Sequence, residues 1–218
     1  MPPKPKFTRE QLVDAAFELV REQGVDALVA RELAKRLNTT TTPIFTFFNS
    51  MDELKAEVYS IAVERITAYL RESFNYYPTF KEFGLRWVKI AKHDPHLYSL
   101  LFLQTGAKRC KNGLLTEDFQ DVYTDIKTSI VDTFGISSDE AEELFDVMSI
   151  YAQGLASMFA LGYDIMKEEE FDRLVTKLVL SYVAGCKIKT DSLDLKMAKE
   201  MLSNEGKTPV HKSEIKFT

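Results

Sequence analysis

The chain of 218 residues contains few cysteines, glycines and prolines. Its two cysteines, Cys110 and Cys186, lie far apart and form no CxxC pair, so neither a disulfide framework nor a zinc finger is expected. Nine glycines and seven prolines are fewer than a fold of many short strands and turns needs. This composition favours an all-α protein.

We also expect neither a signal peptide nor a membrane span. The first residues, MPPKPKFTRE, include no apolar stretch, and the run LVLSYVAGC is too short to cross a bilayer. We therefore expect a soluble, cytoplasmic protein without a membrane partner.

Motifs for catalysis are missing as well: there is no Gly-rich phosphate loop, nucleophile elbow or HExxH sequence. His93, Asp94 and His96 stand within four residues, which is the one arrangement that suggests metal ligation and an enzyme. The alternative is that Asp94–Pro95 starts a helix and the two histidines flank it by chance. We favour this alternative and expect no catalytic residue, no metal and no cofactor.

Charge is distributed unevenly over the chain. Residues 1–48 carry seven Lys and Arg against six Asp and Glu, whereas the remainder carries 21 against 27. A near-neutral N-terminal segment on an acidic body is compatible with DNA binding through that segment alone, and the net charge of -5 argues against indiscriminate binding.

Three short helices are predicted at the N-terminal end. Thr8 and Gln11 form a capping box for the first helix, which Gly24 ends. The second helix fits Ala30 to Leu37. Asn38, which tolerates the left-handed conformation, provides a turn, and Thr40 is a candidate N-cap of a third helix from Thr41 to Phe48.

A second capping box, Ser50 with Glu53, predicts a long helix from Met51 to about Phe74. Apolar periodicity then predicts further helices. Their approximate ranges are 78–93, 95–104, 116–134, 138–161, 167–187 and 190–204.

A tight turn between the second and third helices is typical of a helix-turn-helix, in which the later helix enters the major groove of DNA. Four successive threonines begin that helix although threonine forms helices only moderately well. Their hydroxyls can bond phosphates or base edges, and their methyls can touch thymine. The alternative is that these threonines only cap the helix and face solvent.

Five separated features resemble the DNA-binding domain of the TetR family. They are the Ala pair at 15–16, Gly24, LAKRL at 33–37, IFTFF at 44–48 and S-x-x-E-L at 50–54. The resemblance covers residues 7–65, with the helix-turn-helix at 30–48. It implies DNA contacts by Phe45 and Phe47. The helix-turn-helix geometry adds Thr39, Thr40, Thr41, Thr42 and Thr46, and further candidate contacts are Arg31, Lys4 and Lys6.

The sequence departs from the family pattern at several of these positions. Members usually have Tyr where this chain has Phe45 and Phe47, a phosphate-binding Lys at Met51, and a capping Ser or Thr at Val29. The departures suggest weaker nonspecific phosphate binding, for which Lys4, Lys6 and Arg9 would compensate.

The C-terminal part, 66–204, is expected to be a helical domain that binds a ligand and forms a dimer, followed by a flexible tail at 205–218. HDPHLYSLLF and YAQGLASMF are similar to segments of TetR-type bodies. The resemblance implies a homodimer through helices at about 138–161 and 168–186. It also implies a pocket for an unknown small molecule, with candidate contacts Phe83, Trp87, Tyr98, Phe102, Tyr123, Met148, Tyr151 and Met158.

The sequence therefore predicts a regulator that binds double-stranded operator DNA as a homodimer. By resemblance it is a repressor, released from a palindromic operator by its ligand. The alternative is a regulator of the same fold that acts mainly through protein partners.

Overall fold

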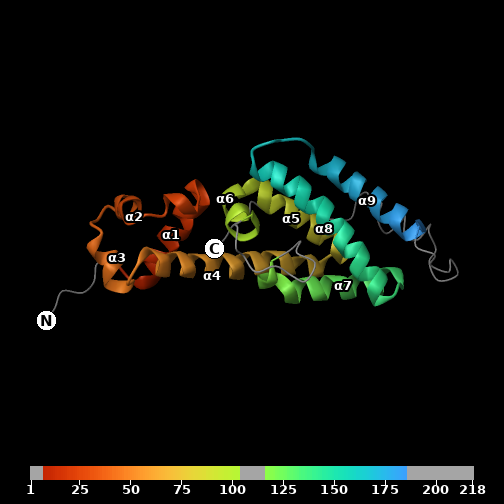
Figure 1. Ribbon diagram of the computed structural model, residues 1–218, viewed down its shortest axis with the longest axis horizontal. Helices are drawn as coiled ribbons and strands as arrows, with labels where there is room; N and C mark the ends of the chain where they lie inside the picture. Colours follow the sequence, from red (N-terminus) through yellow and green to blue (C-terminus); the bar gives the residue numbers. More distant parts are fainter. Residues whose placement is uncertain (1–6, 104–115, 186–218) are drawn as a thin grey trace.

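The computed structural model describes residues 7–103 and 116–185, and this part of the chain is helical without a β-strand (Figure 1). Short 3-10 turns occur at Val25–Ala27, Glu72–Asn75 and Glu117–Phe119. The α-helices are α1 (Arg9–Gln23), α2 (Ala30–Arg36), α3 (Thr42–Phe47), α4 (Met51–Arg71), α5 (Thr79–His93), α6 (Pro95–Tyr98), α7 (Gln120–Phe134), α8 (Ser138–Ala160) and α9 (Glu168–Gly185).

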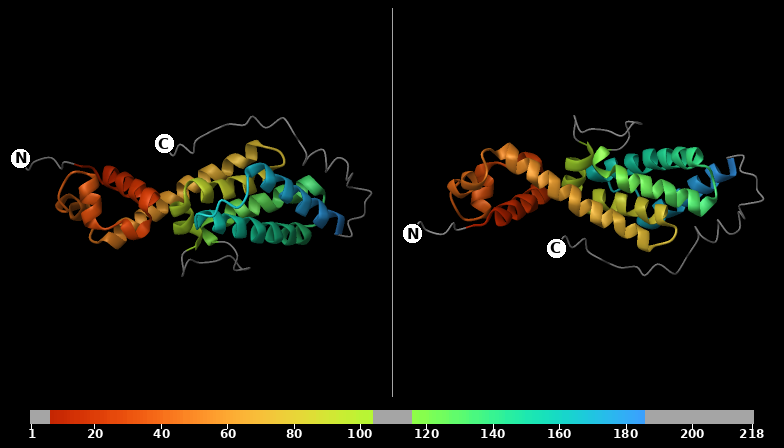
Figure 2. Two further views of the ribbon diagram at one scale, coloured as in Figure 1. Left: turned by 90° about the horizontal axis from the view of Figure 1, so that it is seen from above. Right: turned by 90° about the horizontal axis from the view of Figure 1, so that it is seen from below.

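The molecule has a small head, made of α1 to α3 and the start of α4, and a larger body of α5 to α9. Figure 2 shows the head at one end and the body at the other, with α4 running from one into the other. One hydrophobic core continues through both parts, from Leu12 in α1 to Val179 in α9. Because α4 contributes buried residues along its whole length, a tilt of this helix would move the head relative to the body.

Local sequence signals explain most helix ends. Thr8 and Gln11 form the predicted capping box, and Ser137 forms another with Glu140. The box predicted at Ser50 is only half formed: the Ser50 hydroxyl accepts from the Glu53 backbone, but the Glu53 carboxylate binds Asn49 instead.

Other predicted ends differ by a turn or less. The N-cap of α3 is Thr41, not Thr40, and its side chain makes no capping bond. Two predicted helices change type along their length, since α4 ends in a 3-10 turn and α6 continues as a π-helical turn at Ser99–Leu103. The predicted helix at 190–204 lies outside the described residues, as do Cys110 and Cys186.

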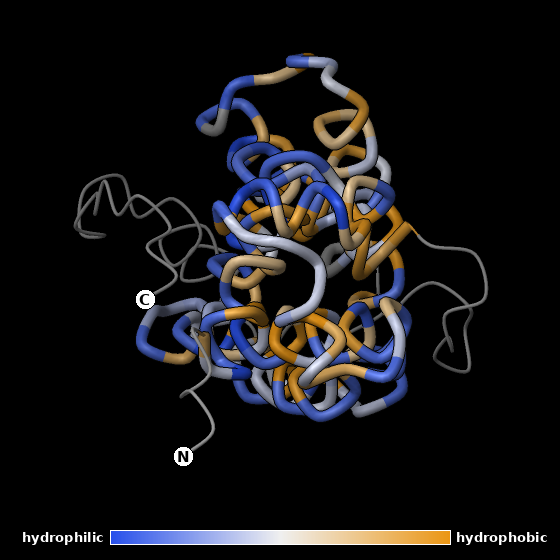
Figure 3. Tube along the Cα trace, turned by 90° about the vertical axis from the view of Figure 1, so that its left-hand side faces the viewer, coloured by the Kyte–Doolittle hydropathy of each residue, from blue (hydrophilic) through white to orange (hydrophobic). Residues whose placement is uncertain are grey.

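The body is built around α5, which packs against α7 and α8. Hydrophobic and hydrophilic residues alternate along the helical turns, as the end-on tube in Figure 3 shows, so each helix has one face for the interior. Trp87 on α5 is the centre of an aromatic cluster with Phe83, Tyr98, Phe102 and Tyr123. No helix in the described ranges is long and apolar enough to cross a membrane.

Candidate nucleic-acid interface

The third helix of the head is anchored by one face and exposed on the other. Ile44 and Phe48 are fully buried in the head, as their spacing predicts. Phe45 lies on the opposite side, and 50% of its surface is exposed. The turn that precedes α3 contains Asn38 in the left-handed conformation, with φ of 48°. This geometry holds α3 out from the head as a helix-turn-helix requires.

The threonines predicted to contact DNA lie on the exposed face. Thr40, Thr41, Thr42 and Thr46 are exposed and Thr39 is half-buried. The Thr46 hydroxyl donates a hydrogen bond of 3.0 Å to the backbone carbonyl of Thr42. Its proton is therefore already used inside the helix, and the side chain offers an outside partner its methyl and oxygen lone pairs.

The two phenylalanines of α3 differ in accessibility. Phe47 is half-buried and packs against the core, whereas Phe45 projects from it. The exposed ring of Phe45 is therefore the larger apolar surface that α3 presents.

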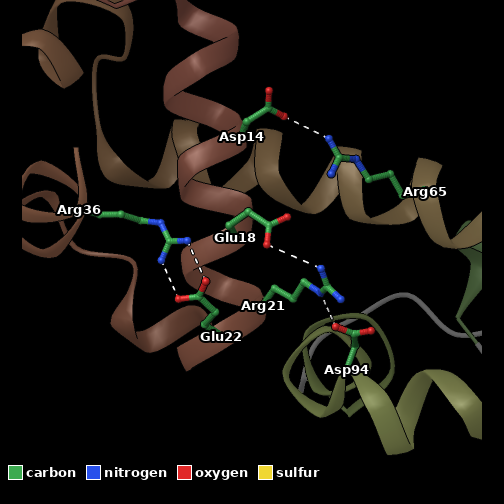
Figure 4. A network of polar contacts seen from close by, with 7 residues as sticks. All are labelled: Asp14, Glu18, Arg21, Glu22, Arg36, Arg65 and Asp94. Carbon is green, nitrogen blue, oxygen red and sulfur yellow. Dashed lines mark hydrogen bonds and ion pairs between the residues drawn. The ribbon is translucent and has the colours of Figure 1, made fainter. Parts of the chain in front are cut away.

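Most described arginines of the head bind carboxylates of the protein. Three of these ion pairs have one partner on α1 (Figure 4). Arg36 of α2 forms two hydrogen bonds with Glu22, of 2.6 and 2.8 Å. Arg65 of α4 binds Asp14 at 3.1 Å. The Arg36 hydrogen bonds lower the pKa of the Glu22 carboxyl, which keeps this pair charged.

Arg9 is also part of the head's internal structure. It lies 2.5 Å from Glu57 of α4 and stacks over the Phe48 ring. If Arg9 binds a DNA phosphate, as the sequence analysis expects, it must give up its ion pair with Glu57. Arg31 on α2 is exposed, and among the described residues no carboxylate pairs with it. Lys4 and Lys6 lie outside the described residues.

A polar contact joins the head to the body. The Arg21 guanidinium of α1 binds the Asp94 carboxylate. Asp94 occupies the N-cap position of α6, but its side chain makes no capping hydrogen bond there. Asp94 is 3% exposed, and its Oδ2 atom has no hydrogen-bond partner within the described parts of the chain. Next to this pair, a Cβ on Gly24 would meet Nδ1 of His96 at 3.3 Å.

Two residues of the His93, Asp94 and His96 cluster, which the sequence offered as possible metal ligands, contact other parts of the protein. Asp94 binds an arginine and His96 packs beside Gly24. The described residues contain no group of three His, Cys, Asp or Glu side chains placed to hold a metal.

The body contains a small apolar cavity between α5, α7, α8 and α9. Its volume of about 30 Å³ is room for roughly one water molecule. No charged side chain lines it, and the lining consists of Phe80, Phe83, Gly84, Trp87, Ile126, Ile130, Phe145, Met148, Ser149, Ala152, Phe171 and Val175.

Three of the predicted ligand contacts, Phe83, Trp87 and Met148, line this cavity. Tyr98, Phe102 and Tyr123 are buried in the aromatic cluster beside it. Tyr151 stacks on Phe171, and Met158 lies on the surface.

Known proteins resemble the head of this chain and, more distantly, about two thirds of its length. Residues 12–58 match a family described as bacterial regulatory proteins, tetR family. The matched residues comprise α1 to α3 and the start of α4, so the head is similar to the DNA-binding domain of the tetR family. Two similar proteins are an HTH-type transcriptional repressor of Mycobacterium tuberculosis and an uncharacterized HTH-type transcriptional regulator of Mycobacterium bovis. Each is 21% identical over 148 residues, which are 66% of this chain and about half, 54%, of the relative.

The structure places two of the residues at which the head departs from the family pattern. Val29 is the N-cap of α2 and makes no side-chain capping bond, and Met51 packs half-buried against the core. Sequence reasoning did not find the Arg21–Asp94 contact, because its partners are 73 positions apart and helical periodicity contains no information about contacts between distant segments.

Proposed function

We propose that this chain is a sequence-specific DNA-binding regulator of the TetR family, and a repressor as the Mycobacterium tuberculosis relative is named. The observation that supports this most is the exposed row of threonines and Phe45 on α3, held out by buried Ile44 and Phe48. Side chains with this freedom can reach base edges in the major groove.

The regulator binds DNA as a homodimer through α8 and α9. An apolar stripe on α8 and its C-cap residue supports this: Ile150, Met158 and Leu161 are 57%, 36% and 68% exposed. Such a stripe is costly in water and is buried by a second copy. A two-fold dimer presents two copies of α3 to successive major grooves, so its operator is a near-palindrome.

Release from DNA follows binding of a small molecule beside Trp87. The cavity lining carries no charge, so the effector is a neutral, largely apolar molecule. The cavity is too small to hold such a molecule without opening. Trp87 contacts Tyr98 at the end of α6 and Phe102 in the π-helical turn that follows, so opening of the cavity would shift α6. A shift of α6 reaches α1 through Asp94 and Arg21, which couples the effector to the heads.

The test of this function is selection of bound duplexes from a random pool by the full chain at low, stated salt. We expect enrichment of a near-palindrome whose half-sites are about one helical turn, or a multiple, apart. Failure to enrich any sequence, with a folded dimer present, would rule out DNA reading and favour action through protein partners.

The effector step has a separate readout in the same protein. Trp87 is the only tryptophan of the chain, so binding in the cavity changes its fluorescence. Neutral aromatic compounds that change this fluorescence are expected to release the selected duplex. Compounds that change it without releasing the duplex would refute the coupling, and the DNA-binding function would stand.

A further inference from the structure

The exposed face of α3 lacks the side chains that usually distinguish guanine and adenine. From residue 39 to residue 48 the sequence is TTTTPIFTFF, without Arg, Lys, Asn, Gln, Asp or Glu. Guanine is read mainly by the forked or cationic donors of Arg and Lys, and adenine by the amides of Asn and Gln. This helix therefore makes no bidentate contact with either purine.

What α3 does expose is a set of methyl groups, hydroxyls and one aromatic ring. Phe45 is half exposed, and Thr41, Thr42 and Thr46 are exposed around it. In the major groove, thymine alone combines a C5-methyl with a nearby O4 acceptor. An apolar ring and threonine methyls gain contact area from that methyl, and free threonine hydroxyls can donate to O4.

We propose that α3 reads thymine C5-methyl groups, so that the base pairs beneath it in each half-site are A·T with the methyl facing Phe45 and Thr46. This inference rests on the proposed DNA-binding function and adds the base chemistry that the helix selects. The Thr46 hydroxyl bond to Thr42 strengthens it, because it leaves the methyl as the apolar contact that Thr46 offers.

Polar side chains near α3 do not replace a purine-reading group on it. The Asn49 amide and backbone both donate to the Glu53 carboxylate, at 2.9 and 2.7 Å. Arg31 is exposed, but it belongs to α2. A guanine contact made by Arg31 would therefore be a contact of α2, and it would not change the base beneath Phe45.

Exposure of a phenylalanine alone would not support this inference, because Phe74 is also 40% exposed on the body. The difference lies in the neighbours. Phe45 stands among exposed threonines on α3, the later helix of the helix-turn-helix, whereas Phe74 borders Arg71, Asp125 and Asp132. Phe74 is therefore a suitable control for a general effect of losing a surface ring.

The test replaces thymine by deoxyuridine, one position at a time, in the duplex that the full chain selects. Deoxyuridine pairs as thymine does and lacks only the C5-methyl. We expect binding to weaken about threefold to fivefold at each position beneath α3, the value of one buried methyl, and to stay unchanged elsewhere. Placing 5-methylcytosine instead of cytosine at such a position should recover part of the affinity lost on replacing thymine by cytosine.

Protein variants assign the methyl to its reader. With Phe45→Ala, binding should weaken overall and deoxyuridine at one position should no longer matter. Phe74→Ala should keep the full deoxyuridine effect. If the chain binds a selected duplex but deoxyuridine has no effect at any position, thymine-methyl reading is wrong and the DNA-binding function stands. If no duplex is selected, both are wrong.

Discussion

At the scale of single residues, Asp94 is the side chain that links the body to the head. It is buried between head and body, one carboxylate oxygen binds Arg21, and the other lacks a hydrogen bond in the described structure. A buried carboxylate depends on its cation, because removing the cation leaves an uncompensated charge. The pair therefore makes the position of the head sensitive to any movement of α6.

We expect Arg21→Ala to lower the free energy of unfolding by about 2 kcal/mol. This is below the usual value for a fully buried pair because Arg21 is partly exposed. Asp94→Asn should cost less, since it removes the charge that Arg21 neutralises. Urea unfolding of both single variants and the double variant measures the coupling. Strictly additive losses would show that the contact does not hold the head.

At the scale of elements, helix ends illustrate what local sequence can predict. Capping pairs such as Thr8 with Gln11 lie three residues apart, so their hydrogen bonds follow from helix geometry alone. The π-helical turn at Ser99–Leu103 and the Arg21–Asp94 pair depend on packing between distant segments. Periodicity along one helix contains no information about such contacts, so the sequence did not predict them.

The site divides in the same way. The exposed threonines of α3 follow from the family resemblance and the helical period, as does burial of Ile44 and Phe48. Which aromatic residues line the cavity depends on how α5, α8 and α9 pack together. Phe83, Trp87 and Met148 line it, whereas Met158 is on the surface, and residue type alone does not separate these cases.

The cap of α8 predicts a dependence of stability on pH. Hydrogen bonds from the Ser137 backbone and hydroxyl lower the pKa of Glu140 below 4.5. A lowered folded-state pKa gives stability that is present above the unfolded pKa and is lost as pH falls through the folded one. Glu140→Gln keeps a capping side chain without this titration, so its melting temperature should fall less steeply than that of the parent below pH 4.5. If the melting temperatures of the variant and the parent fall equally with pH, Glu140 is not the group responsible for this pH dependence.

The ion pairs of the head predict that the affinity for DNA depends only weakly on salt concentration. Arg9, Arg36 and Arg65 are held by carboxylates, so few cations remain for phosphates. Each phosphate contact contributes a slope of roughly -0.9 to the dependence of log affinity on log salt.

Because Lys4 and Lys6 are the predicted arm contacts, changing both to Ala should reduce the slope by about two per head. Lys127→Ala on α7 is the control, since this residue pairs with Glu142 in the body. A salt titration with the double variant would refute the arm contacts if the slope equals that of the control.

At the scale of the whole molecule, the account requires two chains. Each head presents one short reading helix, and the relative position of two heads is set by the bodies that join them. We expect Ile150→Glu combined with Leu161→Glu to place charges on the apolar stripe of α8 and to give a folded monomer. Sedimentation should show half the mass of the parent, with Phe74→Glu as a control that remains dimeric. A double variant that stays dimeric would move the interface elsewhere.

The central claim, that α3 reads operator DNA, is tested most directly by titrating the selected duplex with a variant in which Thr42, Phe45 and Thr46 are all changed to Ala. Fluorescence anisotropy at fixed salt gives the affinities, and circular dichroism checks that the head stays folded. Because each lost methyl or ring contact weakens binding about threefold to fivefold, we predict a loss of roughly 30-fold to 100-fold for the three changes together. Equal affinity of the folded variant and the parent would contradict the account.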